Sequence, residues 1–195
     1  MHLTSLDDTQ LVHQYLKGEE KAFEILLKRH QKRVYTYIVI MTKDRQLAED
    51  IMQDAFVKVI NTLKSGKYND EGKFLPWVMR ICHNLIIDTF RKNAKMPTVE
   101  PKNEDHDIFS TVRILDENAQ DVMVTDQILK DVRKLVDYLP EEQREVILMR
   151  HYSDMSFKEI AEATNVSINT ALGRMRYALI NLRKMVEEKD IALTA

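Results

Sequence analysis

Apolar residues in the first half of the chain recur every three to four positions, the period of an α-helix with one buried face. The stretch "TQLVHQYLKG" predicts a short helix closed by Gly18, and a longer helix follows from Glu19 to about Met41. Asp44 is of a residue type that caps helix N-termini, and it precedes a third helix. The apolar stripe of that third helix consists of Leu47, Ile51, Ala55, Val59 and Leu63.

The helical pattern of apolar residues is interrupted twice, once by a loop and once by a linker. The stretch "SGKYNDEGK" predicts a loop, because Gly, Asn and Asp break helical patterns. A fourth helix is expected from about Phe74 to Lys95, with Pro76 tolerated in its first turn. Residues 96–125 then combine two prolines with an acidic cluster, which indicates a flexible linker.

A second helical block follows the linker. Helices are expected over about Asp126–Tyr138 and from Pro140 onward. Few glycines and prolines, and the lack of strand-like alternation, leave nothing that favours a sheet. The sequence therefore predicts an all-α fold of two small helical domains, residues 1–95 and 126–195, joined by an acidic flexible linker, with a helix-turn-helix in the C-terminal domain.

The helix-turn-helix is predicted by the stretch "SFKEIAEATNVSINTALGRMR", which begins at Ser156. Ser156 and Glu159 have the spacing of a capping box at the start of the first helix. The small Ala161 allows a second helix to cross closely, and Asn165 stands where the turn needs a left-handed residue. Ser167 is expected to cap the second helix.

The second helix of this pair has two chemically different faces. Its inner face is expected to hold apolar side chains, namely Ala171, Leu172, Met175, Ala178, Leu179 and Leu182. Its outer face carries polar and basic side chains, namely Asn169, Thr170, Arg174, Arg176, Arg183 and Lys184. Such a helix can lie in the major groove of DNA, with short polar side chains at base edges and arginines on phosphate or guanine. The competing interpretation is an ordinary helical hairpin with a solvated basic face.

The net charge of −2 does not argue against DNA binding, because the acidic residues are concentrated in one segment. Residues 96–126 hold 2 basic and 8 acidic residues, whereas residues 1–95 hold 16 basic and 12 acidic ones. The single cysteine, Cys82, cannot form an internal disulfide and fits a reducing compartment. Neither a signal peptide nor an apolar run of about 20 residues is visible, so we expect a cytoplasmic protein without membrane insertion.

Polar positions in the fourth predicted helix fall on one ribbon. The ribbon consists of Arg80, Asn84, Asp88 and Arg91, with Trp77 one turn before it and His83, Lys92 and Lys95 beside it. An aromatic ring, an amide and several cations suit single-stranded nucleic acid, whose bases stack and whose phosphates need neutralising. Two simpler interpretations stay open: Trp77 belongs to the core, and Asp88 only pairs with Arg91 or Lys92.

The third predicted helix carries acidic and apolar side chains on its outer ribbon. These are Asp50, Gln53, Asp54 and Val57, with Phe56 beside them. Exposed carboxylates next to apolar groups favour a docking face for a basic protein. The alternative is a solvated helix face without a partner.

Three segments together resemble the extracytoplasmic-function (ECF) sigma factors, small bacterial transcription initiation factors. "AEDIMQDAFVKVI" resembles the helix with which this family binds core RNA polymerase, and "FLPWVMRICHNLIIDTFRKNAK" resembles its promoter-melting helix. "LPEEQREVILMRHYSDMSFKEIAEATNVSINTALGRMRYALINLRK" resembles its DNA-binding domain. The resemblance covers about residues 9–95 and 126–186.

The resemblance implies three groups of site residues. Contacts with the clamp helices of the polymerase's largest subunit are implied for Asp50, Gln53, Asp54 and Phe56. Contacts with the melted −10 element are implied for Trp77, Arg80, Asn84, Asp88, Arg91 and Lys92, with Asn84 holding a flipped base. Contacts with the duplex −35 element are implied for Ser156, Lys158, Ser167, Asn169, Thr170, Arg174 and Arg176.

The recognition stretch departs from the family pattern. Where the family often has a "GTVKSR"-like sequence, this chain has "NTALGR", so that Leu172 and Gly173 replace a usual Lys-Ser pair. A glycine in mid-helix costs roughly 1 kcal/mol relative to alanine. The base preference of the family therefore cannot be carried over to this helix.

The function implied by the resemblance is that of a dissociable specificity subunit of RNA polymerase, with core polymerase and promoter DNA as partners and no cofactor or metal. The linker would thread the polymerase interior, its acidic cluster mimicking nucleic acid. An anti-sigma factor is a common partner in the family but leaves no readable mark in this sequence. An enzyme is not expected, since no metal-ligand spacing, phosphate loop or nucleophile–base pair is visible.

Two alternatives from other functional classes remain open at this stage. A helix-turn-helix regulator that acts without core polymerase would need a sensor domain, and the first 95 residues show no strands of an α/β receiver. A helical adaptor that binds only protein would leave the basic helix face unused, and Arg174→Ala would then not affect transcription.

Overall fold

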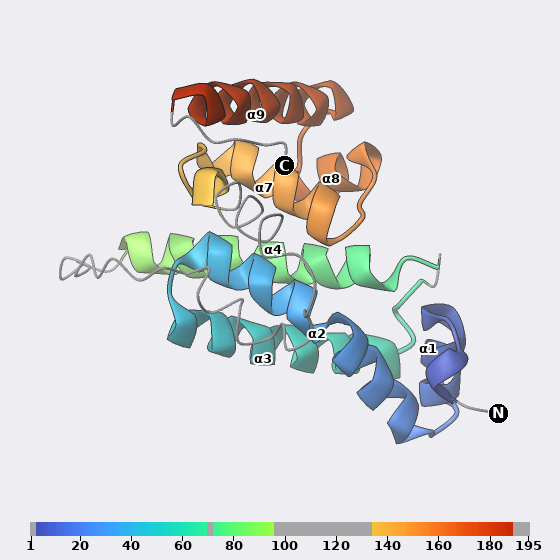
Figure 1. The fold of residues 1–195 in the computed structure, drawn as a ribbon. Coiled ribbons are helices and arrows are strands. Elements are labelled where there is room, and N and C mark those ends of the chain that lie inside the picture. Colours follow the sequence, from blue (N-terminus) through green and yellow to red (C-terminus); the bar gives the residue numbers. More distant parts are fainter. Residues whose placement is uncertain (1–2, 70–71, 96–133, 189–195) are drawn as a thin grey trace, which may run out of the picture. The chain divides into compact units, whose positions relative to one another are not determined.

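The computed structural model describes residues 3–69, 72–95 and 134–188. Every regular element within these ranges is helical, which confirms the all-α prediction (Figure 1). The chain divides into two compact units, Met1–Pro101 and Lys102–Ala195. The predicted linker, residues 96–125, and the first part of the helix expected from Asp126 lie outside the described residues; positions 134–137 are helical.

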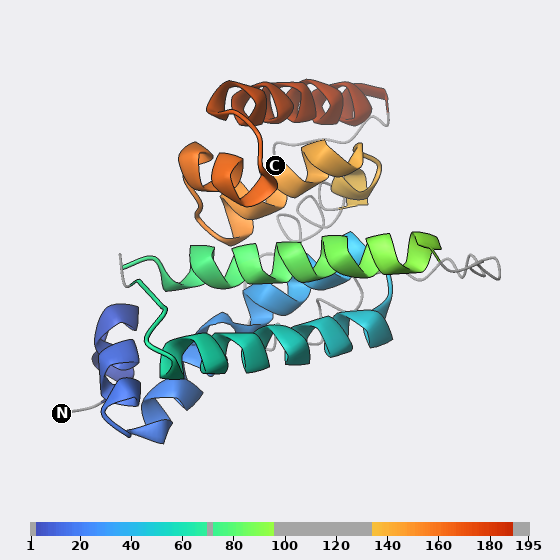
Figure 2. The same cartoon turned by 180° about the vertical axis from the view of Figure 1, so that it is seen from behind.

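The first unit is built around one long helix, α2 (Glu20–Thr42). It lies against α1 (Asp8–Leu16), α3 (Arg45–Lys64) and α4 (Phe74–Lys95), and α3 and α4 also pack on each other (Figures 1 and 2). A short 3₁₀ turn, η1 (Leu3–Ser5), precedes α1 and contacts α2. The C-terminal half of α2 is buried almost all round, from Val34 through Met41 apart from half-buried Tyr35. Such a helix must be enclosed by neighbours, and this explains the bundle.

Side-chain caps fix where the helices of the first unit begin. The Asp44 carboxylate accepts a hydrogen bond from the backbone N–H of Leu47 at 3.0 Å, so the predicted cap of α3 is confirmed. Asp7 forms a capping box with Gln10 at the start of α1. These bonds satisfy backbone donors that a helix leaves unpaired in its first turn.

The second unit holds α7 (Glu141–Tyr152), α8 (Phe157–Thr164) and α9 (Ile168–Glu188). α9 packs on both α7 and α8, and α7 also contacts α8. The buried Arg144 donates to the backbone carbonyls of Asp137 and Leu139 at 3.0 and 2.9 Å, which ties the preceding segment to α7. The Asn181 amide donates to Gln143 Oε1 at 2.8 Å and links α9 to α7.

The predicted inner face of α9 is correct for some residues and wrong for two. Ala171, Met175 and Ala178 are buried, whereas Leu172 and Leu179 are 44% and 50% exposed. The reason is tertiary: α9 packs on α7 and α8 along one narrow line, which consists of Ala171, Met175 and Ala178. The adjacent apolar row of α9 is left in solvent.

Candidate functional site

The helix-turn-helix has the backbone geometry that its sequence predicts. Ser156 accepts a hydrogen bond from the Glu159 N–H, and the Glu159 carboxylate accepts one from the Ser156 N–H at 2.7 Å. Asn165 ends α8 in the left-handed conformation, with φ of 54°. Ser167 Oγ accepts from the Thr170 N–H at 3.0 Å, which caps α9. The capping box, the turn residue and the cap are all confirmed.

These caps also use hydroxyl groups that the sequence assigns to DNA. The Ser156 hydroxyl donates to Glu159 at 2.6 Å, and the Ser167 and Thr170 hydroxyls bond each other at 2.8 Å. To donate to a phosphate, the Ser156 hydroxyl would have to give up its bond to the Glu159 carboxylate, while the two capping-box bonds could stay. Ser167 and Thr170 are exposed and keep acceptor capacity toward a base edge.

The remaining candidates for duplex binding lie on the outside of the motif. Lys158, Asn169 and Arg176 are exposed, and Arg174 is half-buried. Asn169 stands in the first turn of α9, where a recognition helix presents its side chains to base edges. The structure therefore offers an exposed amide and an exposed cation on this helix.

The ribbon on α4 is exposed over most of its length. Asn84, Asp88, Arg91 and Lys92 are exposed, and Arg80 is half-buried. Asp88 lies 3.8 Å from Arg91, so the simpler interpretation of Asp88 as an ion-pair partner is supported. His83 does not flank this surface: it is buried, and its ring contacts the Tyr37 hydroxyl at 3.4 Å.

Trp77 belongs to an aromatic cluster at the start of α4. Its ring centroid lies 4.4 Å from that of Tyr68 and 5.9 Å from that of Phe74. Phe74 is buried, whereas Trp77 and Tyr68 are half-buried. Trp77 is thus neither a core residue nor an open platform, because Tyr68 from the preceding loop packs beside it. The contact between Tyr68 and Trp77 was not visible in the sequence, since the loop breaks the helical period that would align them.

The acidic surface on α3 is exposed as predicted, with one correction. Asp50, Gln53 and Asp54 are exposed, but Phe56 is only 8% exposed and belongs to the core. Phe56 directly follows the buried Ala55, so it turns toward the inside of the bundle with it. The exposed apolar side chain beside the acids is Val57, at 57%. We refer to Asp50, Gln53, Asp54 and Val57 as the α3 surface.

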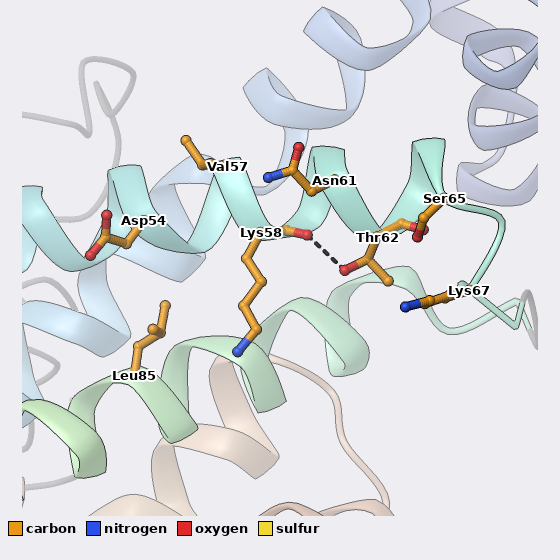
Figure 3. Close-up of a pocket in the computed structure, with 8 residues that line it drawn as sticks. All are labelled: Asp54, Val57, Lys58, Asn61, Thr62, Ser65, Lys67 and Leu85. Carbon is orange, nitrogen blue, oxygen red and sulfur yellow. Dashed lines mark hydrogen bonds between the residues drawn. The ribbon is translucent and has the colours of Figure 1, made fainter.

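A shallow depression of about 540 Å³ connects the α3 surface to α4. Figure 3 shows Asp54 and Val57 toward one end, Leu85 of α4 opposite them, and Lys58 reaching across toward α4. Toward the other end, Thr62 donates to the Lys58 carbonyl at 2.7 Å, and Lys67 lies beyond it (Figure 3). Sequence reasoning missed this feature, because the packing of α3 against α4 creates it. Leu85 directly follows Asn84, so the depression adjoins both candidate surfaces.

Other kinds of site find no support in the described ranges. No group of three or more His, Cys, Asp or Glu residues there could hold a metal ion. No helix among the described residues is long and apolar enough to cross a membrane. Cys82 is buried, and burial raises the pKa of its thiol to about 12. A thiol with such a pKa is unreactive at neutral pH, because the thiolate is the nucleophile.

Two family models match the chain in order. The model for sigma-70 region 2 matches residues 26–96, which include all of α3 and α4 and most of α2. The model for sigma-70 region 4 matches residues 129–177, which include α7, α8 and the start of α9. The matches therefore contain the α3 surface, the α4 ribbon and the exposed turn of α9.

Curated relatives are similar over nearly the whole chain. RNA polymerase sigma-H factor of Pseudomonas aeruginosa is 27% identical over 176 residues, covering 89% of this chain and 90% of the relative. ECF RNA polymerase sigma-E factor of Haemophilus influenzae is 25% identical over 188 residues, covering 94% and 95%.

A solved structure shares the fold. The sigma factor RpoE from Bartonella quintana, in complex with the anti-sigma factor NepR, superposes with a TM-score of 0.61 at 18% identity. The match covers 86% of this chain and 98% of that one. At this level of identity the likeness concerns the fold alone.

Proposed function

The chain belongs to the ECF group of the sigma-70 family, and on that premise we propose that it binds core RNA polymerase through the α3 surface and reads promoters at two separate elements. In this proposal the α4 ribbon binds the −10 element as a melted single strand. The exposed start of α9 binds the −35 element as duplex DNA. The polymerase combines the two DNA contacts, and the chain itself performs no chemistry.

The observation that carries this proposal is the geometry at the start of α9. The left-handed Asn165 and the Ser167 cap hold a short polar turn in solvent, with Asn169 exposed at its outer edge. A helical adaptor that binds only protein would leave the exposed Asn169 and Arg176 of α9 without a role. A regulator that acts without polymerase would leave the α3 surface without a role.

Contact with core polymerase is proposed for the acids of the α3 surface. The test is run-off transcription with core polymerase and a set of candidate promoters. Asp50→Ala combined with Asp54→Ala is expected to reduce the amount of transcript by about tenfold or more. The reason is that charged residues at an interface speed the association of the two proteins and stabilise the complex that forms. Glu24→Ala is the matched control, because Glu24 is an exposed carboxylate of the same unit that pairs with Lys28 at 2.7 Å. Equal loss in both variants would contradict the assignment.

Reading of the melted strand is proposed for Asn84. A flipped base costs a few kcal/mol to extrude, which its binding site must offset. Asn84→Ala is expected to abolish most run-off transcript from duplex promoters, and to lose less on templates whose −10 region is already unpaired. Asn93→Ala removes an exposed amide farther along the same helix and should leave transcription unchanged.

Reading of the duplex element is proposed for Asn169. A good base contact discriminates by about 1–3 kcal/mol. Asn169→Ala should therefore reduce transcription from promoters with an intact −35 element roughly tenfold and change the preferred bases there. Glu187→Ala, an exposed residue at the far end of α9, is the control. An unchanged base preference in Asn169→Ala would remove Asn169 from the reading set.

Regulation by a protein antagonist is also proposed. The structural relative from Bartonella quintana was solved with an anti-sigma factor bound. A factor that works only when joined to polymerase can be silenced by a protein that covers its polymerase-binding surface. Pull-down with the α3 surface variants distinguishes an antagonist that uses this surface from one that binds elsewhere.

A further inference from the structure

A groove of about 530 Å³ runs along the exposed side of α9, beside the start of α8. Its apolar lining includes Phe157, Leu172, Leu179 and Ile180, and its basic lining is Arg176 and Arg183. We call it the α9 groove. Arg176 alone among these residues belongs to the proposed DNA-reading set.

The apolar side chains of the α9 groove are unusually exposed. Leu172, Leu179 and Ile180 are 44%, 50% and 47% exposed, and their spacing places them on one face of the helix. Single exposed apolar residues are ordinary, but a contiguous row with polar edges marks a docking surface. Arg176 and Arg183 lie beside this row and are positively charged. They favour an occupant that carries negative charge as well as apolar groups.

We propose that the α9 groove binds residues 104–117 of the same chain, "EDHDIFSTVRILDE". Apolar residues Ile108, Val112 and Leu115 recur there at the spacing of a helix face, with Phe109 beside them. The segment also holds 5 acidic residues and 1 basic residue. The segment therefore matches the groove both in its apolar residues and in its negative charge.

The length of the intervening chain permits this contact. Between Leu115 and the first described residue of the second unit, Lys134, lie 18 residues, which reach up to about 60 Å when extended. The groove runs along a helix of 21 residues, about 30 Å long. A tethered segment has an effective concentration in the millimolar range, so a weak contact is sufficient. A separate partner protein would have to compete against that concentration.

The contact has a consequence that rests on the proposed function. Arg176 lines the α9 groove, so the docked acids compete with DNA phosphate for its guanidinium. The variant I108S/F109S/L115S keeps all charges and loses the apolar anchors. It is expected to bind non-specific duplex DNA several-fold more tightly than the native chain at low salt.

The direct test measures coverage of the groove without DNA or polymerase, so its outcome is independent of the proposed function. Ile180→Cys places a reactive thiol in the groove of the full-length chain, and the native Cys82 stays silent because it is buried. With the native segment, alkylation of Ile180→Cys by iodoacetamide is expected to be at least fivefold slower than in the I108S/F109S/L115S background. Protection should weaken with rising salt, since it depends partly on charge.

The matched control is Tyr177→Cys, on the same helix, 61% exposed and outside the groove lining. Its alkylation rate should be equal in both backgrounds, which also verifies that the segment variant is folded. A second variant, D105N/D107N/D116N, alters charge alone and should give intermediate protection. Equal rates for Ile180→Cys in all backgrounds would overturn the proposal. Protection that grows with protein concentration would overturn it in favour of a second copy as the occupant.

Discussion

At the scale of single residues, Asn165 shows how one backbone angle supports a site. Its φ of 54° is costly for most L-residues, by about 1–2 kcal/mol, while Asn and Gly tolerate it. Asn165→Gly is therefore expected to leave the free energy of unfolding unchanged or slightly higher. Asn165→Val is expected to lower it by about 1 kcal/mol, as measured by urea unfolding followed by circular dichroism. Equal destabilisation by both substitutions would mean that the amide, rather than the angle, is needed.

Asp8 is the residue that ties α1 to α2. Its carboxylate lies 2.6 Å from Arg29 Nη1 and 2.7 Å from His30 Nε2. Burial raises the pKa of Asp8, but the hydrogen bonds from His30 and Arg29 lower it by more, so the net pKa falls below its usual 3.8. Such a carboxyl stabilises the fold above its unfolded pKa, and the contribution is lost as the pH falls through the folded value.

Asp8→Asn is accordingly expected to lower the free energy of unfolding at pH 7 by about 1–2 kcal/mol. Stability curves of variant and native chain should converge as the pH falls through the lowered pKa of Asp8, because the native carboxyl then becomes protonated. Glu24→Gln is the control: hydrogen bonding from Lys28 lowers the pKa of Glu24 too, but the pair is exposed, and no change is expected. Curves that stay parallel down to acid pH would contradict the role given to the Asp8 charge.

At the scale of elements, α9 contains a glycine that its helical position does not require. A Cβ added at Gly173 meets nothing within 4 Å, and its φ is not positive. Gly173→Ala is expected to raise the free energy of unfolding by about 0.5–1 kcal/mol. Gly66→Ala is the matched comparison, because its Cβ would also meet open space but its φ is +67°, and it should destabilise. Thermal unfolding of both variants checks the opposite signs.

The element scale is also where sequence reasoning failed. Leu172 and Leu179 have the helical spacing of core residues, yet they are exposed, and Phe56 sits beside exposed acids, yet it is buried. Helical periodicity identifies an apolar stripe, but it does not show how much of that stripe the neighbouring helices cover. Only three residues of α9 are buried, whereas six residues of α3, which packs on α2 and α4, are buried and include Phe56.

At the scale of the whole molecule, the proposed function divides DNA recognition between two surfaces, which the polymerase would combine. The α9 face offers few cations, and the strand proposed for the α4 ribbon must first be melted. The free chain is expected to bind promoter duplex weakly and without nanomolar specificity, and to form a tight complex once core polymerase is added. Gel-shift titration with and without core enzyme checks this. Nanomolar, sequence-specific binding by the free chain would favour a regulator that acts alone.

The sequence by itself determined the described helices and their caps, because these depend on local rules. The capping box of Ser156, the left-handed Asn165 and the cap at Asp44 involve residues within a few positions of one another. Only the tertiary structure decided which apolar faces are covered, that Tyr68 packs on Trp77, and that a depression joins α3 to α4. Those features depend on how closely neighbouring helices pack and on which faces they cover. A local sequence pattern does not contain this information. The open apolar row on α9, and with it the α9 groove, belongs to this second class.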